Sequence, residues 1–372
     1  MSMQVLYVQP YVPHYRVPLF NSLAQRLAER GDSLVVAAGH ASGAQAKRSD
    51  EISDLPWLVP VESSVWNTPV GEFKYRAKLN SLMGQSQVCV MELDVGNVNA
   101  WHSLFLKRQS SMVLWGHGKS YTKPPRPAVE RIKYRLARRA DHIMTYTESG
   151  RKHLVIGGIP ADRITAVGNS TDTKVLIKEF RSRQRRDLRF SEAFGVTTHQ
   201  RPVAMYAGGL DGDKRVDFLC AAGAVAHRMD PDFLLLVAGS GEDEGLLEPG
   251  IRAGYVRHLR HADAKSLADM ATVAQALWMP GRVGLVAVDA MALQIPIFST
   301  NFPFHAPEYE FLTPGVNLQV LVNDPEMFAK QAFSFMKSGA RAKISVGDPG
   351  LPTIDSVVSS MVNVIDLVVG RT

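Results

Sequence analysis

The chain has 372 residues, of which 45% are hydrophobic and 21% are charged. That length suffices for two or three domains with large buried cores, and the apolar fraction excludes a disordered chain. The two cysteines, Cys89 and Cys220, lie far apart in the sequence. They predict neither a disulfide framework nor a thiolate metal site, so we expect a reducing, cytoplasmic compartment.

The net charge of +6 is unevenly distributed. Residues 1–175 contain 22 Lys or Arg and 14 Asp or Glu, a net charge of +8, whereas residues 176–372 contain 20 and 22, a net charge of −2. The excess indicates an anionic partner for the first half, namely nucleic acid, an acidic membrane surface or a phosphorylated substrate. No apolar run reaches the roughly 18 residues of a membrane span, and the first residues do not resemble a signal peptide. Any membrane contact is therefore expected to be peripheral.

In the first half, short β-branched runs alternate with helical patterns, which is typical of a parallel, doubly wound sheet. The predicted strands are Val5–Val8, Ser33–Ala38, Val88–Glu92, Met112–Trp115, Ile143–Thr147 and Ile164–Val167. A helix is expected from about Val17 to Arg30. Another is expected over Ala128–Ala140, with its arginines turned away from a buried stripe of Val129, Ile132, Leu136 and Ala140.

The second half repeats this alternation. Its predicted strands are Val203–Tyr206, Phe233–Val237, Ala276–Met279 and Ile295–Phe298, and its helices are Asp217–Arg228, Ala264–Thr272 and Leu285–Leu293. The highly charged segment Lys174–Gln200 predicts a solvated surface helix followed by a linker, and Ile354–Val369 predicts a last amphipathic helix. Both halves therefore belong to the α/β class.

Ligands of such sheets bind beyond the carboxyl ends of the strands, so the loops at those ends carry the candidate chemistry. In the first half, His14, Tyr15 and Arg16 precede a helix amino terminus, a position that favours anions. Helix capping with a surface arginine is the structural alternative. His117 stands between two glycines after a strand, where it has little shielding and can approach a ligand closely.

In the second half, Gly208 and Gly209 follow a strand and allow close backbone approach, while Lys214 and Arg215 offer positive charge to a phosphate. The Gly-Lys-Ser/Thr ending of a P-loop is absent. The glycines of the next strand-ending segment, Gly239 and Gly241, predict a tight structural turn.

The most informative segment is Pro280-Gly-Arg-Val-Gly-Leu285, which joins a strand to a helix. The amides of Val283, Gly284 and Leu285 are expected to be free and to face an anion at the helix amino terminus. Asp289 follows one helical turn later, within reach of a hydroxyl pair such as a ribose diol.

The order of these motifs resembles that of retaining glycosyltransferases of family 4 (glycosyl transferases group 1), of the type that builds bacterial surface polysaccharides. The similar segments span nearly the whole chain: Pro13–Arg16, Trp115–Gly118, Asn169–Asp172, Ala207–Asp217 and Gly284–Ala292. The resemblance implies a GT-B fold, two Rossmann-like domains facing each other across a cleft. Residues 1–174 would form the acceptor domain, with the C-terminal helix in 354–372 packed back on it, and residues 175–353 the nucleotide-sugar donor domain.

The resemblance also implies roles for single residues. Lys214, assisted by Arg215, would offset the diphosphate charge of a UDP- or GDP-sugar, and Asp289 would take the ribose hydroxyls. His117 would face the donor sugar near its anomeric carbon. The remaining donor-side residues would be Gly208, Gly209, Arg282, Val283, Gly284 and Leu285, and the acceptor-side residues would be His14, Tyr15 and Arg16. Fixed cations and a helix amino terminus would stabilise the departing diphosphate, so no metal and no other cofactor is expected.

Two positions depart from the family pattern, because the family usually has Arg where Gly209 stands and Glu where Gly281 stands. Some bacterial polysaccharide transferases share the Pro-Gly-x-Val-Gly-Leu variant.

Two other functions are alternatives to an active transferase. One is a catalytically degenerate GT-B protein that binds a nucleotide or partners an active transferase, and the other is a GT-B nucleotide-sugar epimerase. A Rossmann dehydrogenase is excluded because no Gly-x-Gly-x-x-Gly follows an early strand.

The acceptor that the resemblance implies is a glycan or a polyprenyl-phosphate-linked molecule, and an anionic surface of the inner membrane is a possible partner.

Overall fold

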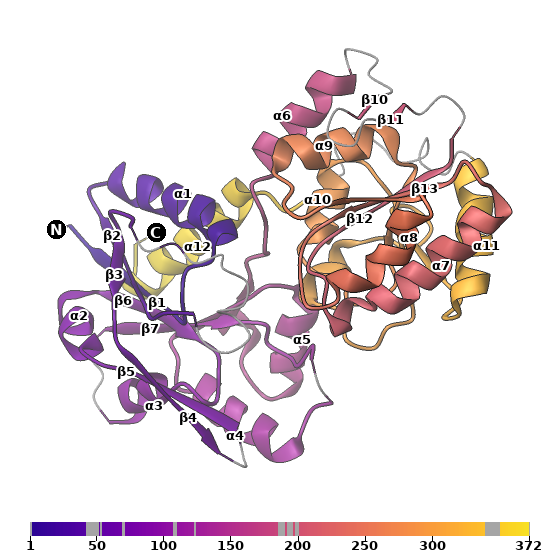
Figure 1. Ribbon diagram of the computed structural model, residues 1–372. Coiled ribbons are helices and arrows are strands. Elements are labelled where there is room, and N and C mark those ends of the chain that lie inside the picture. Colours follow the sequence, from indigo (N-terminus) through magenta and orange to yellow (C-terminus); the bar gives the residue numbers. More distant parts are fainter. Residues whose placement is uncertain are drawn as a thin grey trace. The chain divides into compact units, whose positions relative to one another are not determined.

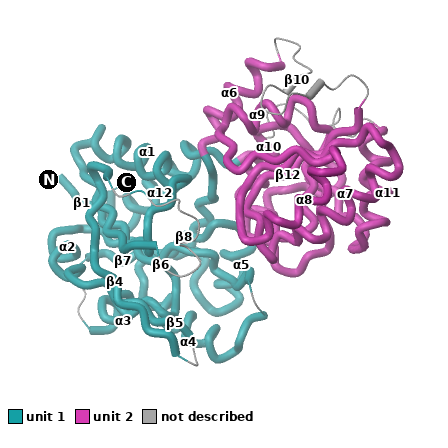
Figure 2. The backbone as a smooth tube through the Cα atoms, in the orientation of Figure 1, with its two compact units in different colours: residues 1–171, 352–372 teal, residues 172–351 magenta. Residues whose placement is uncertain are grey.

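The computed structural model of the chain divides into two compact units, residues 1–171 with 352–372 and residues 172–351 (Figure 2). We call them unit 1 and unit 2 and describe each by itself. The residues that the structure describes are 2–41, 52, 54–68, 71–106, 110–122, 124–184, 190–191, 196–197, 201–338 and 350–371. Among their helices, none is long and apolar enough to cross a membrane.

Unit 1 is built on a seven-stranded parallel sheet with the order β3-β2-β1-β6-β7-β8-β9 (Figure 1). Its strands are β1 (Gln4–Gln9), β2 (Ser33–Ala38), β3 (Leu58–Pro60), β6 (Val88–Glu92), β7 (Ser111–Gly116), β8 (His142–Thr145) and β9 (Ile164–Ala166). Successive side chains enter two different hydrophobic clusters, as Val5 and Tyr7 against Leu6 and Val8 illustrate. The sheet is therefore covered on both faces, which explains its continuous apolar runs.

The helices that the described residues of unit 1 form around this sheet are α1 (Val17–Ala28), α2 (Leu79–Gln85), α3 (Val98–Phe105), α4 (Pro127–Ala137), α5 (Glu148–Ile156) and α12 (Ile354–Val369). The last helix has the bounds that the sequence predicts, and it lies beside α1 (Figure 1). Thr353 caps it, since its side chain accepts the Ser356 amide. A buried carboxylate, Asp32, accepts hydrogen bonds from Arg30 and Arg371, and Arg30 also pairs with Asp366.

The buried stripe predicted for α4 is wrong at one position. Ile132 is exposed, whereas Lys133 is buried and pairs with Glu130 at 2.7 Å. Glu130 also pairs with His153 of α5, which draws this part of α4 toward a neighbouring helix. An apolar pattern alone does not reveal such an inward ion pair. Unit 1 also contains an unexpected antiparallel hairpin, β4 (Ser63–Thr68) and β5 (Gly71–Arg76).

Unit 2 has a six-stranded parallel sheet with the order β14-β13-β12-β15-β16-β17. Its strands are β12 (Val203–Ala207), β13 (Leu234–Ala238), β14 (Val256–Leu259), β15 (Ala276–Met279), β16 (Ile297–Thr300) and β17 (Leu318–Leu321). Its helices are α6 (Thr173–Gln184), α7 (Val216–Met229), α8 (Glu248–Arg252), α9 (Ala264–Val273), α10 (Val286–Ala292) and α11 (Pro325–Lys337). A small pair, β10 (Phe190–Ser191) and β11 (Val196–Thr197), is antiparallel. The α/β fold class is confirmed in both units.

The prediction that Lys174–Gln200 forms a solvated helix and a linker is only partly confirmed. Leu176 and Phe180 of α6 are buried in the core of unit 2, and α6 packs along α9. The helix is therefore amphipathic rather than solvated, although its charged residues mask the apolar period. Most of 185–200 lies outside the described residues.

The two sheets share one topological feature. In unit 1 the strand order reverses between β1 and β6, and in unit 2 it reverses between β12 and β15. At such a switch point the following loops diverge to opposite faces of the sheet and leave a crevice at the carboxyl ends of the strands. Each unit therefore has one position that is suited to a ligand.

Candidate functional site

The switch point of unit 2 brings together the two most informative motifs of the sequence. Residues 208–215, the Lys214 loop, follow β12, and residues 280–285, the Gly281 turn, follow the neighbouring strand β15. Lys214 ends a short 3-10 helix over Gly212–Lys214 and is half-buried. The Lys214 loop and the Gly281 turn are far apart in the sequence, and the parallel pairing of β12 with β15 brings them together.

Three contacts fasten the loop to the turn. The Lys214 ammonium donates to the backbone carbonyl of Arg282 at 2.8 Å, and the Arg282 amide donates to the carbonyl of Asp213 at 2.8 Å. The Arg282 guanidinium also pairs with the Asp213 carboxylate, again at 2.8 Å. We call this set of contacts the clamp. It fixes the cationic side chains of Lys214 and Arg282 on neighbouring loops.

Gly281 is the residue that the clamp requires. A Cβ at this position would lie 2.5 Å from the carbonyl oxygen of Asp213 and 2.5 Å from the carbonyl carbon of Lys214. Real side chains do not tolerate such distances to backbone atoms, so a larger residue would displace the Lys214 loop. The glycine at position 281 therefore has a steric reason in this chain.

Gly209 behaves differently. Among the described residues, the one neighbour within 4 Å of an added Cβ is Oδ2 of Asp211, at 3.1 Å, a side-chain atom rather than backbone. The carbonyl of Gly209 accepts a hydrogen bond from the buried Tyr206 hydroxyl at 2.5 Å. Gly208 has φ +151°, and its carbonyl oxygen would lie 1.8 Å from a Cβ on Gly239. The glycine at 239 thus serves backbone packing.

Arg215 points toward the ends of the next two strands. Its guanidinium donates to Asn323 Oδ1 at 2.5 Å and to Thr300 Oγ1 at 3.4 Å, and it lies over the Phe218 ring. Its backbone is left-handed, with φ +56°, a conformation that favours glycine. The arginine therefore occupies a strained position, and its side chain is fixed by neighbours.

The expectation that the Val283 amide is free is wrong. That amide donates to Nδ1 of His305 at 3.1 Å, and the Val283 carbonyl accepts the Ala306 amide at 2.8 Å. Within the part of the chain that the structure describes, the amides of Gly284 and Leu285 have no hydrogen-bond acceptor. Two donors of the Gly281 turn therefore remain for an anion.

His305 is a site residue that the sequence analysis missed. Burial lowers its pKa to about 4, and the positive charges of Lys214 and Arg282 act in the same direction. Its ring stacks on Tyr309 at 3.8 Å and 5°, and Nε2 lies 3.4 Å from the Thr300 carbonyl. A neutral imidazole can thus accept the Val283 amide and position the turn. Its sequence signal is weaker than that of His117, because His305 follows a strand but has no glycines beside it.

Asp289 lies on the first turn of α10 and is half-buried. Its backbone carbonyl accepts the Leu293 amide at 2.9 Å, so the residue is part of the regular helix. The helix begins at Val286, one residue after the expected start. Asp289 therefore follows directly on the turn whose two amides remain available.

In unit 1, His117 is exposed beyond the carboxyl end of β7. Its ring lies against Tyr146 and Tyr121, with centroids 4.9 and 5.6 Å away. Gly118, with φ +75°, passes so close to the start of α5 that a Cβ would lie 2.5 Å from the Gly150 carbonyl oxygen. Gly118 thus allows the loop to pack against α5, while the imidazole of His117 stays exposed.

The three residues before α1 differ in their exposure to solvent. His14 is exposed and Tyr15 half-buried, but Arg16 is buried. Its guanidinium donates to Asn169 Oδ1 at 2.9 Å and to the Tyr146 hydroxyl at 3.1 Å. It also lies 4.7 Å from the centroid of the Trp115 ring. These contacts tie the guanidinium to the interior of unit 1, and the place of Arg16 at an acceptor site stays a prediction.

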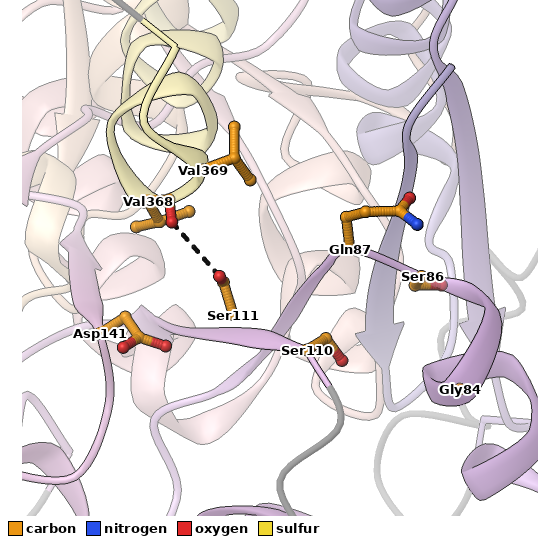
Figure 3. A pocket seen from close by; sticks show the side chains of 8 residues that line it. All are labelled: Gly84, Ser86, Gln87, Ser110, Ser111, Asp141, Val368 and Val369. Carbon is orange, nitrogen blue, oxygen red and sulfur yellow. Dashed lines mark hydrogen bonds between the residues drawn. The ribbon is translucent and has the colours of Figure 1, made fainter. Parts of the chain in front are cut away.

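A groove of about 660 Å³ lies elsewhere in unit 1 (Figure 3). It is lined by Gly84, Ser86, Gln87, Ser110, Ser111, Asp141, Val368 and Val369. Figure 3 shows Ser111 bonded to the Val368 carbonyl, and Asp141 accepts the Met112 amide. These residues stand at the amino ends of the strands, the edge of a parallel sheet opposite the one that binds ligands. We do not assign the candidate site to this groove.

Across the described residues, no three His, Cys, Asp or Glu side chains form a group that could hold a metal ion. The donors at the unit 2 switch point are instead ammonium, guanidinium and backbone amide groups. Such groups bind phosphate oxygens.

Residues 201–338, which cover most of unit 2, match the family model described as Glycosyl transferases group 1. No curated protein sequence is significantly similar to the chain. Among solved structures, a sucrose-phosphate synthase of Thermosynechococcus elongatus has a TM-score of 0.67 and 15% identity, with all of both chains covered.

Two further solved structures are similar over the whole length. Anabaena HepE in complex with UDP has a TM-score of 0.63 and 14% identity, covering 99% of this chain and 100% of that one. A glycosyltransferase of Rickettsia africae has a TM-score of 0.62 and 11% identity, with both chains fully covered. At these identities the likeness concerns the fold, which is that of GT-B proteins with two Rossmann-like domains.

Proposed function

We propose that this chain is a retaining glycosyltransferase of family 4, which moves a sugar from a UDP- or GDP-sugar to a glycan or a polyprenyl-phosphate-linked acceptor. The product would be a bacterial surface polysaccharide or glycolipid. One observation carries the proposal: at the unit 2 switch point, Lys214 and Arg282 are held beside two backbone amides that lack acceptors. The match of residues 201–338 to Glycosyl transferases group 1 supports it.

Unit 2 would bind the donor. The Lys214 ammonium and the amides of Gly284 and Leu285 would bind diphosphate oxygens, and Asp289 would accept the ribose hydroxyls. Arg215 would add positive charge nearby, whereas Val283 and Gly208 would shape the backbone rather than contact the phosphates. Anabaena HepE, which shares the fold, has been solved with UDP.

The chemistry needs no metal in this proposal. The bond between the anomeric carbon and the diphosphate oxygen breaks, and negative charge grows on that oxygen, where Lys214 stabilises it. The acceptor oxygen forms the new bond on the same face, and its proton passes to the departing phosphate. The sugar thereby keeps its anomeric configuration without an enzymic base.

Unit 1 would bind the acceptor in this proposal. His14 and Tyr15 remain candidates because they are at least partly exposed, whereas the buried Arg16 would orient Tyr146 and Asn169. We assign His117 a catalytic role in contacting the transferred sugar. Its aromatic neighbours restrict the ring, which would lower the entropic cost of such a contact.

A panel of UDP- and GDP-sugars, scored for slow hydrolysis by the full chain, tests the transferase function without knowledge of the acceptor. We expect release of the nucleotide from one donor class, and its loss in Lys214→Ala. The matched control is Lys265→Ala, which removes an exposed lysine of α9 in the same unit. Turnover of no donor, although UDP or GDP binds, would favour the catalytically degenerate GT-B protein, the second candidate that Gly209 motivates.

A further inference from the structure

The outward face of α4 carries an unusual concentration of arginines. Five exposed arginines lie on the helix or at its ends: Arg126, Arg131, Arg135, Arg138 and Arg139. The single acid of the helix, Glu130, is half-buried and paired with Lys133 and His153. The positive charge of this face is therefore not neutralised within the helix.

The helix lies between the ends of two others. On one side, the Arg139 guanidinium lies 5.0 Å from the ring centroid of Phe105, the last residue of α3. On the other side, Arg138 donates to the carbonyl of Gly157, directly after α5, at 2.8 Å. The carboxyl ends of α3 and α5 thus flank these five arginines, which we call the arginine ridge. All three helices belong to unit 1 (Figure 2).

Each flank exposes an aliphatic side chain. Leu106, which follows α3, is 79% exposed, and Ile156, which ends α5, is 86% exposed. Ile132 on α4 itself is 42% exposed. Single exposed apolar residues are ordinary on protein surfaces. Here three of them stand on and beside a ridge of arginines, which makes this face both cationic and apolar.

We propose that this face of unit 1, formed by the arginines of α4 with Leu106, Ile132 and Ile156, docks on an anionic lipid bilayer. Guanidinium groups form paired hydrogen bonds with the phosphates of lipid headgroups. Aliphatic side chains enter the boundary between headgroups and acyl chains, and the two attractions together hold a protein that neither would hold alone. The arginines would stay at headgroup level while the aliphatic residues reach deeper.

The composition of the face favours a bilayer over nucleic acid. Single-stranded nucleic acid is bound by exposed aromatic rings on which bases stack. On this face the aromatic rings are already engaged within unit 1: Phe105 lies against Arg139 and stacks on Trp101, and the hydroxyl of Tyr134 is bonded to His153. The protruding side chains are aliphatic. The proposal does not depend on the donor chemistry of unit 2, so the two can fail separately.

Co-sedimentation of the full chain with vesicles tests the proposal. We expect binding to vesicles of phosphatidylglycerol with phosphatidylcholine, weak binding to phosphatidylcholine alone, and loss of binding as salt is raised. Arg131→Gln/Arg135→Gln and Leu106→Ser/Ile156→Ser should each weaken the binding by about tenfold or more. UDP affinity should not change in either variant.

Matched controls lie in unit 2, where Arg252 and Arg260 are exposed arginines and Val316 and Met327 exposed apolar residues. Arg252→Gln/Arg260→Gln removes the same net charge, and Val316→Ser/Met327→Ser removes two apolar side chains that are each about half exposed. Both should bind vesicles like the parent chain. Equal binding to both lipids, equal losses in the control variants, or capture of DNA in preference to anionic vesicles would overturn the proposal.

Discussion

The switch points of the two units occupy the same place in similar sheets, yet they differ in charge. In unit 2, Lys214, Arg215 and Arg282 gather there beside two amides without acceptors. In unit 1, the strand next to the switch point, β6, ends in Glu92. Burial raises the pKa of Glu92, although the positive charge of Arg76 acts in the opposite direction. Asp94 follows two residues later. The loops at the two switch points thus differ: cations follow β12 and β15 in unit 2, whereas a carboxylate paired with Arg76 ends β6 in unit 1.

The comparison also changes the meaning of the charge split in the sequence. In the near-neutral half, Lys214, Arg215 and Arg282 lie at the switch point, whereas in the basic half five exposed arginines lie on or at the ends of α4. Lys123, within the basic stretch from Lys119 to Arg139, lies outside the described residues. Net charge therefore identified the half with a charged surface and not the half with the phosphate-binding groups.

The largest expected effect comes from restoring the family's glutamate. In Gly281→Glu the new side chain would collide with the carbonyls of Asp213 and Lys214 and break the clamp. We expect UDP affinity to fall by about a hundredfold, and the free energy of unfolding of unit 2 by about 3 kcal/mol. Calorimetric titration and denaturant unfolding check this. Normal UDP binding by the variant would refute the steric explanation.

A stability change confined to unit 1 sharpens the contrast between the units. Asp32 is buried and accepts from the Met3 amide, Arg30 and Arg371. Asp32→Asn leaves Arg371 without its carboxylate, and we expect it to destabilise unit 1 by about 2–4 kcal/mol. UDP affinity at a temperature where the variant stays folded should be unchanged. A large loss of affinity would mean that the units are not independent in donor binding.

The low pKa of His305 predicts how unit 2 responds to acid. The unfolded chain binds a proton at its ordinary pKa of 6.5, and the folded unit binds it only at about 4. Unfolding therefore takes up a proton between these values, so the contribution of His305 is complete above pH 6.5 and is lost as the pH falls toward 4.

We expect His305 to account for about 1–2 kcal/mol of the stability lost on lowering the pH, since the ring is partly exposed. Urea unfolding at pH 7 and pH 5 measures this loss. In His305→Asn, whose amide oxygen can still accept from Val283, the loss should be smaller. An identical loss in the parent chain and the variant would exclude the histidine as its source.

The smallest effect should be a gain. Gly209 has room for a side chain, and Gly209→Arg would place a guanidinium on the Lys214 loop beside the Asp211 carboxylate. We expect UDP affinity to rise severalfold, since a charge-assisted contact is offset in part by its pairing with Asp211. Weaker UDP binding by a folded variant would mean that the two departures from the family pattern share one steric cause.

The predictable parts of the fold are those governed by apolar period. Strands such as Val88–Glu92 and the helix Ile354–Val369 have their predicted bounds because both are buried along regular stripes. The edge strands β14 and β17 were not predicted, because each interrupts a four-residue apolar run with polar side chains: Arg257 and His258 in β14, and Gln319 in β17. In α4 the apolar pattern predicted the wrong buried face, because Lys133 is buried in an ion pair with Glu130 while Ile132 is exposed.

For the site, the sequence located loops but not their mutual contacts. Lys214 and Arg282 were singled out separately, and only the pairing of β12 with β15 brings them together. The commitment of Arg16 to Asn169, and of the Val283 amide to His305, depends on residues more than 20 positions away in the chain. Long-range hydrogen bonds of this kind leave no local pattern in a sequence.

Calorimetric titration of the full chain with UDP and GDP tests the central claim, that the cations and amides of the unit 2 switch point bind a nucleoside diphosphate. We predict that one of the two nucleotides binds, that Lys214→Ala weakens its binding by about 10–100-fold, and that Lys265→Ala leaves the affinity unchanged. Binding of neither nucleotide, or equal affinities in all three proteins, would contradict the assignment of the donor site.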